Sequence, residues 1–226
     1  MREIIFDTET TGLKPEEGHR LVEIGCVELV NRVETGATFH VYINPGRPMP
    51  AEAEAVHGLS DQFLSDKPRF GAIVDSFLEF VADAPLVAHN ASFDVSFLNY
   101  ELEQAGREAL EAQRIIDTLQ LARKRFPGAK HTLDALCARF GVDRSSRIKH
   151  GALLDAQLLA QVYVELAGGR QIGFELAAAA LGEEEEKSTA FKPLRRPVRP
   201  HLVPAAELEA HRAFIAKISN AIWNDP

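Results

Sequence analysis

Cysteine is scarce in this chain, and long apolar runs are absent. The only two cysteines among the 226 residues, Cys26 and Cys137, lack the spacing of a metal site, so we expect both to be reduced, buried and apolar in character. No apolar run approaches the ~18 residues of a membrane span, and the N-terminus has no basic-then-apolar signal pattern. These absences argue against a disulfide scaffold and a membrane protein, and they predict a cytoplasmic location.

The chain also lacks the excess of basic residues that is typical of non-specific duplex binders. Its net charge is −8, and residues 1–182 carry all of it, with 26 acidic against 18 basic side chains. Because phosphate neutralisation supplies most of the affinity for a duplex, this balance favours contact with a strand end only. One stretch, 123–149, holds eight Lys and Arg against two acids. We expect it either to lie beside a bound strand or to form a solvated helix face.

The periodicity of apolar residues predicts one α/β domain with a mixed sheet. A hydrophobic content of 46% is ample for a single core. Alternation predicts strands at 4–10, 20–30 and 37–43, with residues 31–36 as the turn between the last two. Later segments alternate between helical periodicity and short apolar runs, which favours helices packed on the sheet. The predicted helices cover 70–82, 94–104, 118–125, 133–140 and 153–166, and short strands cover 86–88 and 115–117.

Two carboxylates stand one residue apart at the end of the first predicted strand. Successive side chains of a strand point to opposite faces, so Asp7 and Glu9 share one face and project together. Their mutual repulsion is relieved if they share a hard divalent cation, for which Mg²⁺ and Mn²⁺ are the usual choices. Taken alone, the pair is equally consistent with a polar strand end that turns at Thr11 and Gly12.

Two further acids and a histidine accompany this pair. Asp94 follows the short strand 86–88 at the start of a predicted helix, where capping or a first-turn position is the ordinary role of an acid. His150 precedes Asp155 by five residues, and Asp155 faces inward on the helix 153–166. A single histidine of this kind is more often structural than catalytic. Four acids and one histidine in this order are nevertheless less expected by chance than any one of them.

Three segments together resemble the motifs of one enzyme family. The sequences DTETTG at 7–12, HNASFD at 89–94 and HGALLDA at 150–156 resemble the three exonuclease motifs of the DnaQ-like, DEDDh class of 3′→5′ exonucleases. Within this class they are most similar to the epsilon, or proofreading, subunits of bacterial DNA polymerase III. The resemblance is strong over most of the chain and looser in its tail, and it implies a ribonuclease-H-like fold.

The resemblance implies hydrolysis of a phosphodiester bond with two divalent metal ions, Mg²⁺ or Mn²⁺. Asp7 would bridge the two ions, Glu9 and Asp155 would complete the site of the ion that carries the attacking water, and Asp94 would hold the second ion. His150 is the implied general base. A histidine with its ordinary pKa near ~6.5 is mostly neutral at pH 7 and is able to accept a proton.

The resemblance also implies a pocket for the terminal nucleotide, with Glu52 near its 3′ hydroxyl. Aromatic and apolar side chains suit such a pocket because every base has a π-face, although core packing is an equal expectation for Val56 and Phe93. No residue reads base identity here, so mispaired ends would be selected because they cost less to unpair. The implied lining residues are Thr10, Thr11, Glu52, Val56, His57 and Phe93.

The sequence changes character near the end of the predicted exonuclease domain, 1–182. Gln171, Phe174 and Leu176 resemble the peptides that bind the bacterial sliding clamp, and a fragment of a terminal helix is the ordinary alternative. Residues 183–204 combine an acidic run with prolines and basic residues, which predicts a flexible linker. The segment 205–226 is helical in pattern, and a lone helix is marginal in water, so we expect it to dock on a polymerase. Its apolar stripe and flanks comprise Leu208, Phe214, Ile215, Ile218, Ile222 and Trp223.

Three functions are consistent with these features. The first is a proofreading exonuclease that binds a DNA 3′ end, the catalytic (alpha) subunit of polymerase III and the sliding (beta) clamp, with a small third core subunit left open. The second is a free-standing RNA or oligonucleotide exonuclease, against which the docking arm argues. The third is a non-catalytic scaffold between polymerase and clamp, against which the complete set of five active-site residues argues.

Overall fold

The computed structural model describes residues 1–145, 147, 149–169 and 204–218. The chain divides into two units, Met1–Ala178 and Ala179–Pro226, and each is described by itself. Across these described ranges, no helix combines the length and the apolar character that a membrane crossing requires. The predicted clamp motif and residues 183–203 of the predicted linker lie outside the described residues, as do Ile222 and Trp223.

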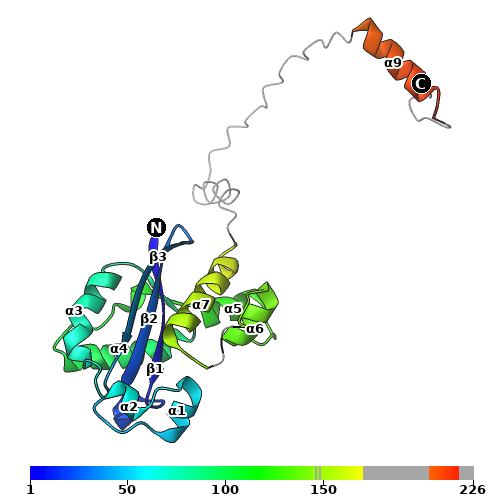
Figure 1. The fold of residues 1–226 in the computed structure, drawn as a ribbon. Coiled ribbons are helices and arrows are strands. Elements are labelled where there is room, and N and C mark those ends of the chain that lie inside the picture. The colour runs from blue at the N-terminus through cyan, green and yellow to red at the C-terminus, as the bar shows by residue number, and fades with distance from the viewer. Residues whose placement is uncertain (146, 148, 170–203, 219–226) are drawn as a thin grey trace. The chain divides into compact units, whose positions relative to one another are not determined.

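A five-stranded mixed sheet forms the centre of the first unit (Figure 1). The strand order is β3-β2-β1-β4-β5, in which β1, β2 and β3 pair antiparallel while β4 and β5 run parallel to β1. The predicted mixed sheet is therefore confirmed. The strands are β1 (Arg2–Thr10), β2 (Leu21–Val30), β3 (Val33–Tyr42), β4 (Leu86–Ala88) and β5 (Ile115–Asp117).

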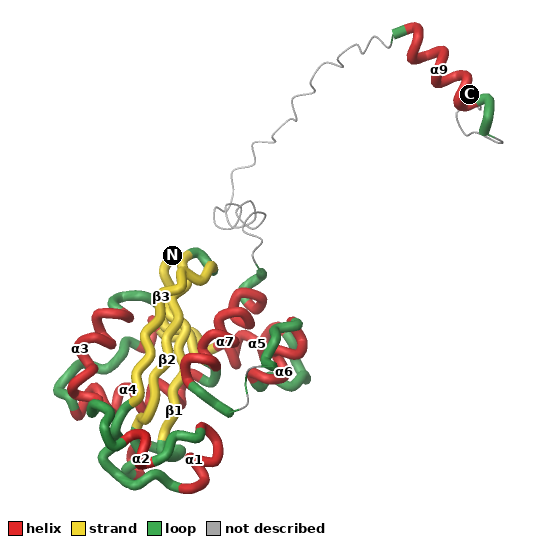
Figure 2. The backbone as a smooth tube through the Cα atoms, in the orientation of Figure 1, coloured by secondary structure: helices red, strands yellow, loops and turns green. Residues whose placement is uncertain are grey.

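Helices cover both faces of this sheet, with α3 and α4 on one face and α5, α6 and α7 on the other (Figures 1 and 2). Side chains of β1 alternate between the two layers: Ile4 and Phe6 join the core under α3 and α4, while Ile5 joins the core under α7. Asp7 and Glu9 continue the register of Ile5, so they face the α7 layer. The helices are α3 (Phe70–Val81), α4 (Ala91–Gln104), α5 (Thr118–Arg125), α6 (Leu133–Phe140) and α7 (Ala152–Leu166).

The hairpin between β2 and β3 is tighter than predicted. Asn31 and Arg32 alone form the turn, with φ values of 51° and 64°, and β3 begins at Val33 rather than at residue 37. Two residues with positive φ match the twist of the flanking strands. The Arg32 Nη1 atom donates to the Ala167 carbonyl oxygen at 2.5 Å, a contact from a distant helix that the local sequence does not reveal.

Two short helices were not predicted, α1 (Ala51–His57) and α2 (Asp61–Leu64). The residues of α1 are mostly exposed, and α2 spans one turn that the Ser60 hydroxyl caps by accepting from the Phe63 amide. Neither segment carries the repeated apolar spacing by which longer helices are recognised. Together they form a layer beyond the ends of β1 and β2 (Figure 1).

In the second unit, helix α9 spans Ala205–Ile215, within the predicted segment 205–226. Leu208, Phe214 and Ile218 are exposed there, and Ile215 is buried. In the first unit, Cys26 on β2 and Cys137 on α6 are both buried and free of disulfide bonds, as predicted.

Candidate active site

A glycine on β2 brings the first turn of α7 to the acids of β1. Asp7 lies opposite Gly25 in the antiparallel pairing. A Cβ atom at Gly25 would lie 2.2 Å from the Leu153 amide nitrogen and 2.4 Å from the Ala152 carbonyl carbon. The missing side chain therefore permits the close approach of α7, and Asp155 in its first turn comes beside Asp7 and Glu9.

Asp94 reaches the same place from the opposite layer. It lies in the first turn of α4, which begins at Ala91 rather than at residue 94 as predicted, because Asn90 turns the chain with a φ of 63°. The Asp94 Oδ1 atom accepts hydrogen bonds from the Thr8 amide at 3.1 Å and from the Thr8 hydroxyl at 2.7 Å. These bonds attach the start of α4 to β1 and hold this carboxylate at the edge of the sheet.

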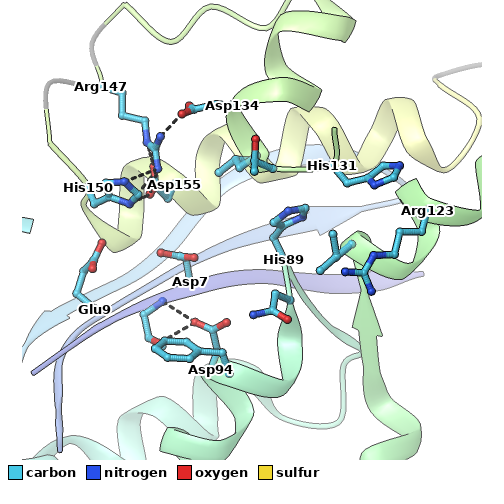
Figure 3. Close-up of a pocket in the computed structure, with 16 residues that line it drawn as sticks. Asp7, Glu9, His89, Asp94, Arg123, His131, Asp134, Arg147, His150 and Asp155 are labelled. Carbon is cyan, nitrogen blue, oxygen red and sulfur yellow. Dashed lines mark hydrogen bonds and ion pairs between the residues drawn. The ribbon is translucent and has the colours of Figure 1, made fainter. Parts of the chain in front are cut away.

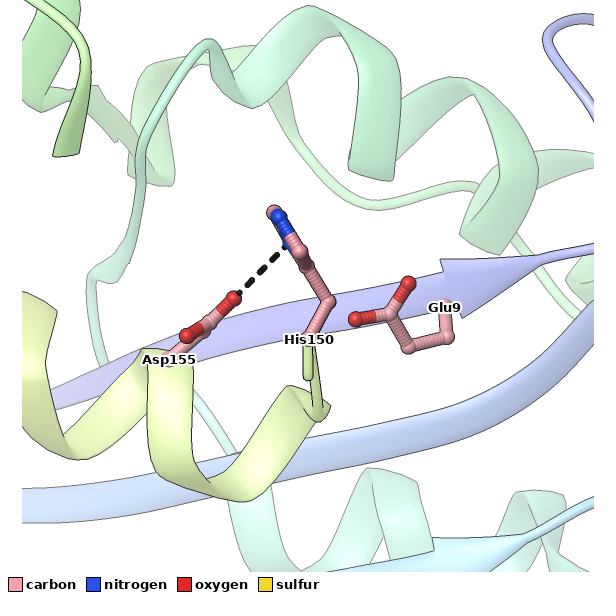
Figure 4. A group of neighbouring side chains, drawn as sticks. All are labelled: Glu9, His150 and Asp155. Atoms are coloured by element: carbon pink, nitrogen blue, oxygen red, sulfur yellow. Dashed lines mark ion pairs between the residues drawn. The ribbon is translucent and has the colours of Figure 1, made fainter. Parts of the chain in front are cut away.

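The five residues predicted for the active site line one cleft of about 870 Å³ (Figure 3). Three of them, Glu9, His150 and Asp155, each offer an atom to a group whose members lie within 4.8 Å of one another (Figure 4). The cleft opens where the parallel strands β1, β4 and β5 end, the edge at which α/β sheets commonly bind ligands. The structure thus brings together Asp7, Glu9, Asp94, His150 and Asp155, which we call the acidic cluster.

Burial and mutual repulsion raise the pKa values of three of these carboxyls. Burial raises the pKa of Asp7 well above its ordinary value, and the charges of Asp94 and Glu9 raise it further. Burial, followed by the charge of Glu23, raises the pKa of Glu9 to about 8. Burial raises the pKa of Asp94 to about 7 despite the hydrogen bonds from Thr8. Such a set of oxygen donors fits a hard divalent cation, whose charge would stabilise the ionised forms.

Arg147 contacts these five residues through Asp155, and the sequence analysis did not assign it a role in the site. Its Nε and Nη2 atoms donate to the two Asp155 carboxylate oxygens at 2.5 and 2.7 Å, and its Nη1 atom donates to Asp134 Oδ1 at 2.8 Å. The hydrogen bond to Asp155 raises the pKa of Arg147 above its ordinary value. The only sequence signal was its place in the basic stretch 123–149, three residues before His150.

His150 lies in a loop at the mouth of the cleft and is half exposed. Its Nδ1 atom is 3.0 Å from Arg147 Nη2 and 3.3 Å from Asp155 Oδ2. A guanidinium group only donates and a carboxylate only accepts, so this ring nitrogen can accept from Arg147 or donate to Asp155 according to its tautomer. The His150 amide donates to the Val56 carbonyl oxygen at 3.3 Å, which joins this loop to the end of α1.

A second cavity of about 500 Å³ adjoins the acidic cluster. Thr8, Glu9 and Phe93 line both cavities, so the second cavity adjoins the first at these three residues. Val56 is 48% exposed, which rules out the alternative that it is a core residue, whereas Phe93 packs partly against the core and also lines the cavity. The lining includes all six residues predicted for the terminal nucleotide: Thr10, Thr11, Glu52, Val56, His57 and Phe93.

Comparison with known proteins agrees with this arrangement. A sequence family described as "Exonuclease" matches residues 4–163, which include every residue of the acidic cluster. The chain belongs to this exonuclease family. The family predicted from the three motifs is therefore confirmed.

Relatives of this exonuclease match it over nearly its whole length. The DNA polymerase III subunit epsilon of Rickettsia felis is 50% identical over 232 residues, which cover 96% of this chain and 97% of the relative. The corresponding subunit of Escherichia coli K12 is 43% identical, over 94% of this chain and 91% of the relative. The similarity extends beyond the catalytic region, so the exonuclease is grouped with the epsilon subunits.

Solved structures share the exonuclease fold. Exonuclease X in complex with 5′ overhanging duplex DNA matches with a TM-score of 0.56 and 26% identity, over 73% of this chain and 89% of that one. The nuclease domain of 3′hExo, a DEDDh family member bound to rAMP, matches with a TM-score of 0.65 and 18% identity, over 74% and 91%. The second likeness concerns the fold alone, and it confirms the predicted fold class.

Proposed function

We propose that this exonuclease removes mispaired nucleotides from the 3′ end of a DNA strand, as the proofreading subunit of DNA polymerase III. The observation that carries the proposal is the convergence of four carboxylates and a histidine in one cleft. Full-length similarity to epsilon subunits supports the choice of DNA polymerase III over other settings.

The carboxylates would hold two divalent cations, Mg²⁺ or Mn²⁺. Asp7 would contribute to both sites, together with Glu9 and Asp155 for one ion and Asp94 for the other. When bound, such a pair supplies an activated water and stabilises charge on the phosphate and on the leaving oxygen. The raised pKa values of Asp7, Glu9 and Asp94 support this assignment, because an acidic cluster at neutral pH is stabilised by a compensating cation.

Protein side chains perform the remaining tasks of the reaction. His150 would accept the proton of the attacking water, since its ring lines the cleft, half exposed and 3.3 Å from Asp155. Arg147 orients Asp155 through two hydrogen bonds, and Thr8 orients Asp94 through two others. Fixed ligand carboxylates reduce the reorganisation that catalysis requires.

The adjoining cavity would receive the 3′-terminal nucleotide. Its volume of about 500 Å³ lies within the range of roughly 300 to 1,000 Å³ typical of small-molecule sites. Val56 and Phe93 would contact the base, and Glu52 would lie near the 3′ hydroxyl, with Thr10, Thr11 and His57 completing the lining. The pocket would accept any base, so preference for a mispaired end would follow from the lower cost of unpairing it.

The C-terminal segments would join this exonuclease to its partners. The residues Gln171, Phe174 and Leu176 would bind the sliding clamp, and the helix beginning at Ala205 would dock on the polymerase catalytic subunit through its exposed apolar side chains. A third core subunit is compatible with this arrangement. Residues 183–204 would act as the linker between the exonuclease domain, with its clamp motif, and the helix that docks on the polymerase.

The proposal is tested with 5′-labelled DNA primers whose 3′ ends are paired or mispaired, digested with Mg²⁺ in the presence and absence of a polymerase catalytic subunit. We expect stepwise shortening from the 3′ end, faster for the mispaired primer and faster again when the catalytic subunit is present. A clear preference for RNA oligonucleotides, with no effect of the polymerase, would favour the free-standing exonuclease. Absence of any metal-dependent cleavage would favour the scaffold.

A further inference from the structure

The cleft continues beyond the acidic cluster on the side opposite the second cavity, which we call the nucleotide pocket. His89, Arg123 and His131 line this part of the cleft (Figure 3), which we call the distal limb. None of these three residues lines the nucleotide pocket, whereas Thr8, Glu9 and Phe93 line both the cleft and the pocket. The carboxylates therefore lie between the distal limb and the nucleotide pocket, and the terminal nucleotide needs only the pocket.

We propose that the distal limb binds the strand on the 5′ side of the scissile bond and that Arg123 contacts its phosphodiester backbone. The inference rests on the proposed function, because a nucleic acid strand is continuous. If the terminal nucleotide occupies the pocket beside Glu9 and the scissile phosphate meets the carboxylates, the rest of the strand leaves on the other side. The distal limb is the open part of the cleft on that side.

Arg123 is an arginine of the distal limb that the described residues leave available for a ligand. It lies in the last turn of α5 and is exposed, and no hydrogen bond or ion pair joins it to any residue in the described part of the chain. The neighbouring arginines are already engaged. Arg125 donates to the carbonyls of Glu165 and Leu166, Arg139 lies over the Phe126 ring, and Arg144 and Arg147 pair with Asp134.

The charge of the site gives Arg123 a physical role. Single-stranded nucleic acid carries one negative charge per nucleotide, and its first phosphate on the 5′ side would approach a cleft that contains four carboxylates. Burial lowers the pKa of His89, whose Nδ1 atom contacts the Thr118 hydroxyl at 2.8 Å, so this ring is neutral at pH 7. The guanidinium of Arg123 is always charged and suits a phosphate group.

The test compares two substrates that differ on the 5′ side of the scissile bond. One is oligothymidylate, and the other is the p-nitrophenyl ester of thymidine 5′-phosphate, in which nitrophenol replaces the upstream strand. For Arg123→Ala we expect the KM for the oligonucleotide to rise about tenfold, as for the loss of one charge-assisted hydrogen bond, with less than a twofold change in kcat/KM for the ester. The slope of log KM against log salt should fall by roughly 0.7, the value for one phosphate contact on a single strand.

Lys124→Ala provides the matched control, because Lys124 is exposed on the same helix and does not line the cleft. It should leave both substrates unchanged, and Arg123→Lys should restore most of the oligonucleotide affinity. An equal loss on both substrates would overturn the proposal, since Arg123 would then act on the cluster or on the fold. An unchanged KM for the oligonucleotide would overturn it as well. The wild-type chain is assayed in parallel, so a lack of 3′→5′ hydrolysis there would count against the proposed function and not against the distal limb alone.

Discussion

At the residue scale, Asp7 and Asp155 have the same charge but different neighbours. Arg147 neutralises Asp155 through two hydrogen bonds, whereas Asp7 is surrounded by other carboxylates. We expect Asp7→Asn to raise the melting temperature of the metal-free protein, by about 2 to 4 °C for each ~1 kcal/mol of relieved repulsion. Asp155→Asn should lower it, because Arg147 would lose the more buried of its two carboxylate partners and keep only Asp134.

Calorimetry in the presence of EDTA distinguishes these two variants. Equal stabilisation by both substitutions would show that Arg147 does not balance the charge of Asp155. A sequence-based expectation would have treated the two acids alike, since both belong to the same motif set.

The raised carboxyl pKa values predict how the stability of the metal-free protein depends on pH. Glu9, with a pKa of about 8, and Asp94, with a pKa of about 7, bind protons in the folded state that they release in the unfolded state at neutral pH. Stability from these groups is fully present below their unfolded values near ~4 and is lost as pH rises through about 7 and 8. Melting temperatures in EDTA should therefore decrease as the pH rises from about 5 to about 8 and level off above that, as far as these groups determine them.

Saturating Mg²⁺ should weaken or remove this decrease, because bound cations favour the ionised carboxylates. The same linkage predicts that metal binding at pH 7 releases protons, which titration calorimetry in buffers of different ionisation enthalpy would detect. A flat stability profile without metal would contradict the electrostatic description of the cluster.

His150 is expected to act on the proton and not on the metal. His150→Ala should lower kcat by roughly 10² to 10⁴, the usual range for the loss of a general base, while the affinity for Mn²⁺ changes little. The comparison is informative because His150 lies close enough to Glu9 and Asp155 to be a ligand itself. A parallel loss of metal affinity and activity would assign it as a ligand.

The sequence predicted the five residues of the cluster because each stands in a motif with fixed spacing. It did not predict Arg147, whose role depends on the path of the loop that precedes His150. The sequence also left open whether Val56 is a core residue or a pocket residue. The answer depended on helix α1, which was not predicted and which holds Val56 exposed beside the cleft. Contacts between distant segments, and not local patterns, decide such cases.

At the scale of elements, the approach of α7 to β2 determines whether the site assembles. Gly25→Ala would place a methyl group 2.2 Å from the Leu153 amide nitrogen, so the helix would have to move away from the sheet. We expect a destabilisation of about 1 to 3 kcal/mol, as in overpacked cores, and a reduced kcat because Asp155 and His150 move with α7. Denaturant unfolding and the primer assay measure the two effects.

Gly71→Ala is the control for this substitution. Gly71 lies near the start of α3, and a Cβ atom there would meet no atom within 4 Å. Alanine has a higher helix propensity than glycine, so this change should leave stability equal or raised by up to ~1 kcal/mol, with activity unchanged. Similar losses in both variants would show that the close approach at Gly25 is not important.

The sequence predicted the longer elements well, because β1, β2 and the helices α3 to α7 carry repeated apolar positions. It missed α1 and α2, which are short and mostly exposed, and it misplaced the β2-β3 turn. There, the glycine at position 36 suggested a longer loop, whereas Arg32 adopts a positive φ with the support of a contact to Ala167. Tertiary contacts override local turn preferences at this position.

At the scale of the whole molecule, chemistry and tethering are expected to be separable. All five residues of the acidic cluster precede Leu181, so truncation after Leu181 should leave the hydrolysis of short single strands unchanged. Co-purification with the polymerase catalytic subunit should be lost. Proofreading during synthesis should then fall far more than activity on free oligonucleotides, because the tether no longer maintains a high effective concentration at the primer end.

Changing both Gln171 and Phe174 to Ala in the full-length chain is the matched comparison, and it should weaken only the contact with the sliding clamp. Pull-down of the catalytic subunit by the truncated chain at full strength would contradict the docking role of the tail. It would shift the interpretation towards a free-standing exonuclease.

The central claim is that the acidic cluster is a metal-dependent 3′→5′ nuclease centre. It is tested most directly by the rate at which a 3′-mispaired primer loses its terminal nucleotide, measured for the wild-type chain and for Asp7→Asn with Mg²⁺ and with EDTA. We expect rapid release of a mononucleotide by the wild-type chain with Mg²⁺, no release with EDTA, and essentially no release by Asp7→Asn, while circular dichroism shows that the variant remains folded. Wild-type activity in Asp7→Asn, or digestion that persists in EDTA, would contradict the account.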